Sequence, residues 1–275
     1  MQFFFIREST TKNLFEKIFK TIEVKHNVII LNYNKIKKKN IKYKKKVIKE
    51  ILKKLNYYDC KKVILSKKLK QDEILKKLLN DNKIKIINGE NLFKSLLEKI
   101  IEKASMDNNI KPENSQITII SNNLETWLEY LIENISTKYK ILTIVTDNII
   151  CFKKLENNFL EKKGTLITIT NNKKKSLSKS NLIINLSLNE EQINKYSIFE
   201  NSIIINAKGN IKIHKKRFNG KIINNFEITL KKGSKIFGDL LKEEYSYYDI
   251  IDIAEVYILK NPKEISNISI NFLKK

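Results

Sequence analysis

The sequence predicts an α/β protein made of two α/β domains, the second a doubly wound parallel sheet, with a C-terminal helical segment. Three observations support this fold class. Short apolar runs with strand character alternate with segments whose apolar residues recur at helical spacing. The strand-like runs are continuous, which is typical of parallel strands buried on both faces. A turn-rich stretch at 105–115, which contains Pro112, separates two such series.

The first series predicts a small α/β domain over residues 1–106. Its strands and helices alternate along the chain: strands at 27–33, 61–66 and 83–88, and helices at 45–55, 71–80 and 91–104. Asp72 and Glu73 stand in the first turn of the second helix, where the helix dipole favours negative charge. Parallel pairing of the strands is the natural arrangement for this order.

The second series predicts a doubly wound sheet over residues 107–207. Strands are expected at 116–121, 140–146, 165–170, 181–187 and 202–207, with a helical segment between each and the next. Residues 208–275 are less regular, because two extended segments precede helical spacing at 239–259. This C-terminal extension is expected to pack back on the domains.

The formal charge of +24 suggests nucleic-acid binding, but three features weaken that interpretation. All the basic residues except Arg7 and Arg217 are lysines, whereas arginine is the usual carrier of base and phosphate recognition. Lysine, asparagine and isoleucine are inflated together, as in an AT-rich coding sequence. The lysines are spread along the chain, and the one dense run, at 35–46, is interpreted as a solvated loop and helix start. Specific nucleic-acid binding is therefore not expected, although attraction to polyanions at low salt is.

Cysteine usage and hydropathy favour a cytoplasmic protein without a membrane partner. Cys60 and Cys151 lie far apart without a zinc-type spacing, and both are expected to be core thiols in a reducing compartment. The apolar run within residues 1–8 is too short for a signal peptide. No stretch reaches the roughly 18 apolar residues of a membrane helix. The oligomeric state is not predicted.

Residues 115–207 resemble a Rossmann domain, in particular the cofactor domains of shikimate dehydrogenase and glutamyl-tRNA reductase. The stretch LSKSNLIINLS at 177–187 is similar to the segment that forms the fourth strand of those domains. Both families also place an α/β domain before this domain and a helical return after it. The resemblance implies a Rossmann-like second domain. It implies function only weakly, because this architecture hosts many chemistries.

The family's glycine motif is degenerate in this chain. G-x-G-x-x-G falls on Ser121, Asn123 and Thr126, none of which is glycine. In the family, the glycines allow a tight turn, close approach of the pyrophosphate, and packing of helix on strand. Asparagine can adopt the left-handed backbone that such a turn would need, but its side chain occupies the space of the phosphate. Glu125, in the first helical turn, is expected to compete with a phosphate for the same positive helix end.

Asp147 matches the family's pattern. It follows the second strand, about 20 residues beyond the turn, where the family places the acid that bonds the adenosine ribose. An acid there favours NAD over NADP, so NAD is the possible cofactor. The alternative is that Asp147 caps the helix that begins near Ile149. The shikimate-binding residues and the reductase's active-site cysteine have no recognisable counterparts.

Polar residues follow the predicted strands of the second sheet. Ligands of open parallel sheets bind beyond the carboxyl ends of the strands, so these residues are the candidate cofactor-binding set. They are Ser121, Asn122, Asn123, Thr146, Asp147, Thr170, Asn171 and Asn185. With the lysines at 173–175 they would suit a small anionic or nucleotide-like ligand. These residue types are also common in turns, so a purely structural role is the alternative.

No metal site and no catalytic residue are predicted, since two histidines are too few for a His-rich metal site. His214 and Arg217 are interpreted as part of an exposed basic loop, or alternatively as a base and an anion clamp in a cleft between the domains. Asp249, Asp252 and Glu255 form an acidic row at i,i+3 spacing. Such a row either pairs with lysines or binds a divalent cation.

The sequence thus predicts a non-catalytic or atypical nucleotide- or small-anion-binding relative of the NAD(P)-dependent dehydrogenases. Two alternatives stay open. One is an active NAD-dependent oxidoreductase with a modified phosphate turn. The other is a basic module that binds polyanions or proteins on a scaffold of this fold.

Overall fold

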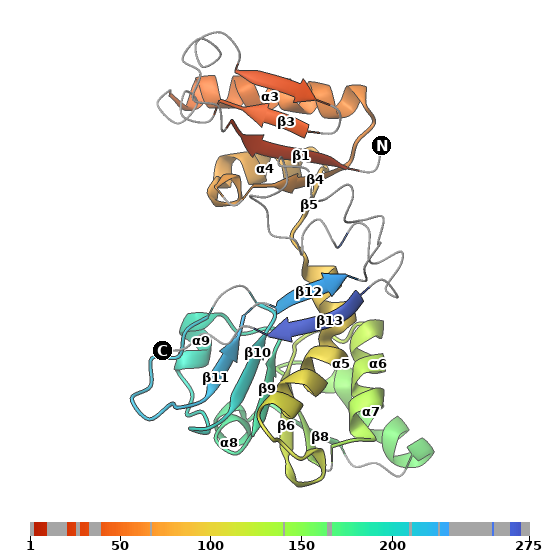
Figure 1. The fold of residues 1–275 in the computed structure, drawn as a ribbon. Coiled ribbons are helices and arrows are strands. Elements are labelled where there is room, and N and C mark those ends of the chain that lie inside the picture. Colours follow the sequence, from red (N-terminus) through yellow and green to blue (C-terminus); the bar gives the residue numbers. More distant parts are fainter. Residues whose placement is uncertain are drawn as a thin grey trace. The chain divides into compact units, whose positions relative to one another are not determined.

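The computed structural model of the chain contains two mainly parallel β-sheets with flanking helices and a separate two-stranded sheet (Figure 1). The structure describes residues 3–9, 21–25, 28–32, 40–66, 68–139, 141–163, 167–208, 211–224, 226–230, 255 and 265–270. The chain divides into one unit of Met1–Glu90 with Lys232–Glu264 and a second of Asn91–Lys231 with Ile265–Lys275. The predicted α/β fold class is confirmed.

The first sheet has five strands in the order β2-β3-β1-β4-β5. They are β1 (Phe4–Glu8), β2 (Ile22–Lys25), β3 (Val28–Leu31), β4 (Lys62–Leu65) and β5 (Lys85–Ile87). All neighbours pair in parallel except β2 and β3, which pair antiparallel. The chain builds β3 on one side of the central β1 and then β4 on the other. The winding therefore reverses between β1 and β4, as in flavodoxin-like sheets.

The two faces of the first sheet carry different apolar clusters, because successive side chains of a strand point to opposite faces. Phe4 and Ile6 pack with the buried residues of α3 (Ile41–Tyr57) and α4 (Glu73–Asp81), which follows the 3₁₀ turn η1 (Leu69–Gln71). The other face carries a separate cluster: Phe3, Phe5, Val28, Ile64 and Ile87. Side chains at Asn40 and Asp72 cap the first turns of the two helices.

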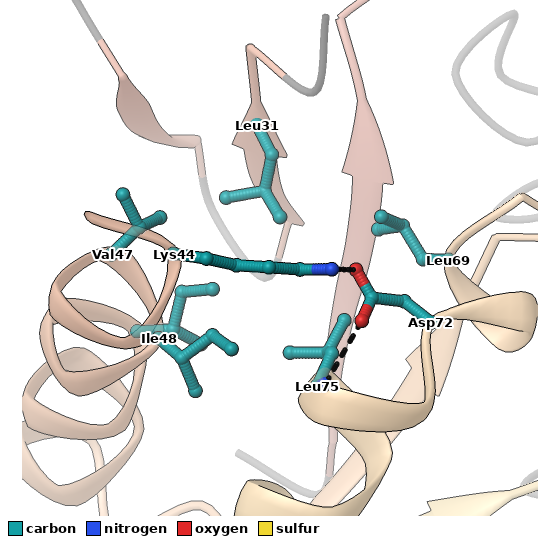
Figure 2. Close-up of a pocket in the computed structure, with 8 residues that line it drawn as sticks. Leu31, Lys44, Val47, Ile48, Leu69, Asp72 and Leu75 are labelled. Atoms are coloured by element: carbon teal, nitrogen blue, oxygen red, sulfur yellow. Dashed lines mark hydrogen bonds and ion pairs between the residues drawn. The ribbon is translucent and has the colours of Figure 1, made fainter. Parts of the chain in front are cut away.

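An ion pair between a partly exposed lysine and a buried aspartate joins the two helices of this face (Figure 2). Lys44 Nζ lies 2.6 Å from Asp72 Oδ2, and Asp72 Oδ1 accepts a hydrogen bond from the Leu75 N–H at 3.1 Å. The Asp72 side chain is 2% exposed. The small pocket around the pair is lined by apolar side chains: Leu31, Val47, Ile48, Ile51, Leu69 and Leu75. Because the charges and the cap satisfy one another, we interpret this pocket as a packing feature.

The second sheet has six parallel strands in the order β11-β10-β9-β6-β7-β8. They are β6 (Gln116–Ile120), β7 (Ile141–Val145), β8 (Ile167–Thr170), β9 (Leu182–Asn185), β10 (Ile203–Asn206) and β11 (Lys221–Ile223). Counted from β6, this is the order 3-2-1-4-5-6 of Rossmann-like doubly wound sheets. The predicted doubly wound parallel sheet is therefore confirmed, and its winding reverses between β6 and β9.

The helices of the second unit include one that the sequence analysis assigns to the first domain. They are α5 (Glu90–Asp107), α6 (Thr126–Ser136), α7 (Ile149–Lys163), α8 (Lys173–Leu177) and α9 (Glu190–Asn194), with the 3₁₀ turn η2 (Pro112–Asn114). Glu98 of α5 accepts hydrogen bonds from Asn134 at 2.9 Å and Lys138 at 3.0 Å. Ser105 of α5 bonds Tyr139 at 2.7 Å. These contacts bind α5 to α6 and the loop after it, and α5 from Asn91 onward belongs to the second compact unit.

Several strands escape the sequence analysis. It assigns no strand to β1 or β2, and it gives β11 only as part of an extended segment. β12 (Phe226–Leu230) pairs antiparallel with β13 (Ile265–Ile270). The sequence analysis assigns no strand to β13. Most of the helical spacing at 239–259, with Asp249 and Asp252, lies outside the described residues, whereas Glu255 is described and buried. Among the helices that the structure describes, none combines the length and the hydropathy that crossing a bilayer requires.

Candidate functional site

The turn between β6 and α6 needs no glycine for its backbone. Ser121 Oγ donates a hydrogen bond to the Asn123 carbonyl at 2.8 Å and closes the turn. Within the described residues, a positive φ occurs at Asp59, Lys83, Gly89 and Asn109, all outside this turn. The turn therefore does not use the left-handed backbone that asparagine could have supplied. The missing glycines affect only the space left for a ligand.

Glu125 does not occupy the positive end of α6, in contrast to the expectation from sequence. It is the N-cap residue, but its side chain makes no capping hydrogen bond. Its Oε2 accepts a hydrogen bond from Trp127 Nε1 at 2.8 Å and lies 3.6 Å from Lys94 Nζ of α5. Lys94 Nζ is also 5.2 Å from the centre of the Trp127 ring. The Glu125 carboxylate is therefore engaged by the Lys94 ammonium and the Trp127 indole and not by the backbone N–H groups of α6.

The first turn of α6 leaves backbone donors available. No acceptor within the described part of the chain takes the N–H groups of residues 123–127. Such groups, with the helix dipole behind them, are the usual donors to an anion at a helix start. A phosphate at this turn would meet donors and not the Glu125 carboxylate.

Four polar side chains meet along the carboxyl edge of the second sheet: Asn122, Asp147, Lys173 and Ser187. We call them the edge cluster. Asn122 Nδ2 donates to Asp147 Oδ2 at 3.2 Å, and Asn122 Oδ1 accepts from the Asp147 N–H at 3.0 Å. Lys173 Nζ donates to Asp147 Oδ1, and Ser187 Oγ accepts from the Asn122 N–H at 3.0 Å. The edge cluster spans the ends of β9, β6, β7 and β8, and so crosses the point where the winding reverses.

Asp147 presents a charged and accessible carboxylate in this cluster. Its side chain is 58% exposed, whereas that of Lys173 is 11% exposed. The hydrogen bond from Lys173 holds the pKa of Asp147 below its ordinary value of 3.8. A carboxylate has about four lone-pair sites, so Asp147 can accept further hydrogen bonds from a ligand. Among the described residues, its carboxylate accepts hydrogen bonds from Asn122 and Lys173 and not from the first turn of α7.

Replacing Lys173 with Met is expected to raise the pKa of Asp147 towards 3.8, because the Lys173 hydrogen bond is the largest cause of the lowering. A depressed carboxyl pKa stabilises the fold above the unfolded-state pKa, and that contribution is lost as pH falls through the folded-state pKa. Wild type should therefore lose, below about pH 4, a stability increment that the variant lacks. Carboxyl ¹³C NMR titration measures the pKa. Lys175→Met on the same helix is the control, and an unchanged pKa in Lys173→Met would contradict the assignment.

Three other predicted site residues have local roles or point to solvent. Thr146 Oγ1 accepts from the Asn148 N–H at 3.0 Å, and Thr170 Oγ1 accepts from the Asn172 N–H at 3.0 Å. Both hydroxyls thus order the turn after their strand. Asn171 is exposed. The structure therefore brings Asn122 and Asp147 of the predicted set together, with Ser121 and Asn123 in the adjoining turn.

Asn185 belongs to a separate, buried network. Its Nδ2 donates to the Leu188 carbonyl at 2.7 Å and to Asn206 Oδ1 at 2.8 Å, and its Oδ1 accepts from the Leu188 N–H at 2.9 Å. Asn206 Nδ2 donates in turn to Asn224 Oδ1 at 2.7 Å. We call Asn185, Asn206 and Asn224 the asparagine ladder; the first two end β9 and β10, and Asn224 directly follows β11. Asn185 is 0% exposed, so the ladder orders the sheet edge and offers Asn185 to no ligand.

The structure also shows the surroundings of His214 and of the two cysteines. His214 Nε2 lies 2.9 Å from Glu190 Oε1 of α9, and Arg217 is exposed, so the two belong to an exposed basic loop. Cys60 is buried as predicted, but Cys151 is exposed because α7 turns Phe152 and not its neighbour to the core. In the part of the chain that the structure describes, no group of three or more His, Cys, Asp or Glu residues could hold a metal ion.

Comparisons with known proteins add little to this geometry. No protein-family model and no curated protein matches the chain. Among solved structures, a putative aspartate carbamoyltransferase from Trypanosoma cruzi shares 10% identity over 76% of this chain and 72% of the other, with a TM-score of 0.31. Aspartate transcarbamoylase from the same organism in complex with phosphate shares 11% over 75% and 72%, also at 0.31. The shikimate dehydrogenase and glutamyl-tRNA reductase resemblance is not supported beyond a general α/β fold with parallel sheets.

Proposed function

We propose that the second unit binds a small nucleotide-like anion at the carboxyl edge of its sheet and performs no chemistry on it. The observation that carries the proposal is Asp147, an exposed carboxylate held by Asn122 and Lys173 beside the open N–H groups of α6. Ribose hydroxyls would donate to the carboxylate. A phosphate would accept from the backbone at 123–127, and the exposed Lys174 and Lys175 would favour its negative charge.

The edge cluster favours a mononucleotide over NAD. In a Rossmann site the pyrophosphate lies over the turn, where glycine lets the backbone approach it. Here the Asn122 N–H is bonded to Ser187, and Asn123 carries a side chain at the second glycine position. Both features reduce the space and the backbone donors that a pyrophosphate would need where the winding of the sheet reverses. We therefore propose a relative of the NAD(P)-dependent dehydrogenases that keeps the ribose and phosphate positions without standard dinucleotide docking.

Isothermal titration of the full chain with AMP, ADP and NAD tests the proposal. Asp147→Asn keeps the shape of the side chain and removes its charge, and it should weaken AMP binding about ten-fold, as expected for hydrogen bonds to a charged acceptor. Asp107→Asn is the matched control. Asp107 is also partly exposed and paired with a lysine, Lys103, but it stands at the end of α5, before β6 begins.

The outcomes separate the three functional classes. AMP binding that Asp147→Asn weakens and Asp107→Asn leaves unchanged would support the proposal. Tight NAD binding together with hydride transfer would favour the oxidoreductase alternative. If none of the three nucleotides binds at millimolar concentration, the proposal fails. DNA or RNA binding that survives physiological salt would then favour the polyanion alternative.

A further inference from the structure

We propose a second anion site, in the first unit and centred on Arg7, that takes one phosphate or carboxylate group of a small molecule. Arg7 lies in β1, the central strand of the first sheet, next to its carboxyl end. The residues that carry this inference all belong to the first unit, so it does not depend on the function proposed for the second.

Arg7 is buried, and its Nε makes no hydrogen bond within the described part of the chain. It is 9% exposed. No hydrogen bond or ion pair joins its guanidinium to any residue that the structure describes. The other arginine of the chain, Arg217, is exposed, so water can satisfy its donors. Arg7 therefore differs from Arg217 in being shielded from the water that could otherwise bond its donors.

A buried guanidinium is stabilised by a bound anion more than other buried cationic side chains are. A buried lysine can give up its proton and become neutral, but a guanidinium holds its proton too strongly to do so and stays charged. A buried charge without a partner is among the most unfavourable arrangements in a protein. The planar fork of N–H donors matches carboxylate and phosphate oxygens in a two-point contact. An oxyanion is therefore the ligand that Arg7 suits.

The neighbouring acid does not meet this need. Strand alternation puts Arg7 on the face of Phe5, while Glu8 points to the opposite face. Glu8 instead accepts a hydrogen bond from Ser66 Oγ, and its Oε1 lies 3.9 Å from Lys68 Nζ. The carboxylate nearest in sequence is thus engaged on the other side of the sheet.

The position of Arg7 agrees with where such sheets bind ligands. The winding of the first sheet reverses between β1 and β4. Open parallel sheets bind ligands beyond the carboxyl ends of the strands at such a reversal. The cluster beside Arg7 is apolar, with Phe3 and Phe5 from its own strand. Low polarity there would strengthen the attraction between the guanidinium and an oxyanion.

An NMR titration of the full chain tests the site directly, because two arginines give two side-chain Nε–H signals. Arg7→Lys assigns them. The probes are inorganic phosphate and acetate, with chloride at equal ionic strength as the reference, and the two arms distinguish a phosphate ligand from a carboxylate ligand. The Arg7 signal should shift and saturate with at least one probe, while the Arg217 signal should not saturate. No saturable shift of the Arg7 signal with either probe, or equal shifts of both signals, would overturn the proposal.

Thermal denaturation gives a second readout. The effective probe should raise the Tm of wild type and of the control Arg217→Met by mass action. In Arg7→Met the apparent affinity should fall at least about ten-fold. An unchanged response in Arg7→Met would overturn the proposal, and if that variant does not fold, the NMR titration decides alone.

Discussion

Gly220→Ala is expected to lower the free energy of unfolding by about 3 kcal/mol, the upper end of what overpacking a core usually costs. A Cβ at Gly220 would lie 2.0 Å from the Ser202 carbonyl oxygen and 2.7 Å from ring atoms of Phe218. The carbonyl cannot simply move away, because it accepts the Lys221 N–H at 3.1 Å where β11 joins β10. Phe218 is 3% exposed and packed in the core. The methyl group must therefore push β11 off the sheet or displace the ring.

Urea denaturation followed by circular dichroism measures this loss. Asn219→Ala is the control at the preceding position. Asn219 is exposed, and the bond from its backbone N–H to the Glu200 carbonyl at 2.8 Å survives the substitution. The control should change the unfolding free energy by less than about 0.5 kcal/mol. A loss below about 1 kcal/mol in Gly220→Ala would mean that β11 can shift without cost to the sheet.

The sequence predicts most elements of both sheets because their apolar periods are local properties. The central strand β1 is the main exception. Its run of phenylalanines lies at the start of the chain, and the charged pair Arg7 and Glu8 within it hides a strand that is buried on both faces. The membership of α5 in the second unit could not be read from sequence either, because it rests on distant partners such as Asn134 and Tyr139.

The sequence predicts which residues belong to the candidate site but not the hydrogen bonds that join them. Strand ends gave Asn122 and Asp147, yet their mutual bonding depends on β6 and β7 lying side by side. Ser187 contributes because β9 returns to the other side of β6. Arg7 was counted only as a rare arginine, since nothing in the sequence shows that its surroundings lack a counter-charge. Strand order and burial, which only the fold supplies, turn these residues into sites.

The asparagine ladder left a signal in the sequence. Asn185, Asn206 and Asn224 each follow two isoleucines at the end of a strand. Parallel pairing sets Asn206 directly beside Asn185, and the same register carried one residue on brings Asn224 beside Asn206. A repeated Ile-Ile-Asn ending in adjacent parallel strands therefore predicts amide-to-amide bonding. In-register asparagines at buried strand ends are interpreted better as mutual partners than as ligand contacts.

Asn185→Ala is expected to lower the free energy of unfolding by about 3 kcal/mol, since it leaves several buried polar groups without partners. The Leu188 N–H and carbonyl lose their bonds to the side chain, and Asn206 Oδ1 loses one donor and keeps the Lys208 N–H at 3.3 Å. The same urea denaturation measures the effect. Asn171 is an exposed asparagine directly after β8, and Asn171→Ala is the control, which should cost less than about 0.5 kcal/mol.

A double-mutant cycle with Asn206→Ala distinguishes a bonded ladder from two independent packing sites. If the amides bond each other, the double variant should cost about 1 kcal/mol less than the sum of the single variants, because each single variant already breaks the shared bond. Strict additivity would mean that the 2.8 Å contact contributes nothing to stability. The ladder would then be a by-product of asparagine-rich strand ends and not a device that fixes the register of β9 and β10.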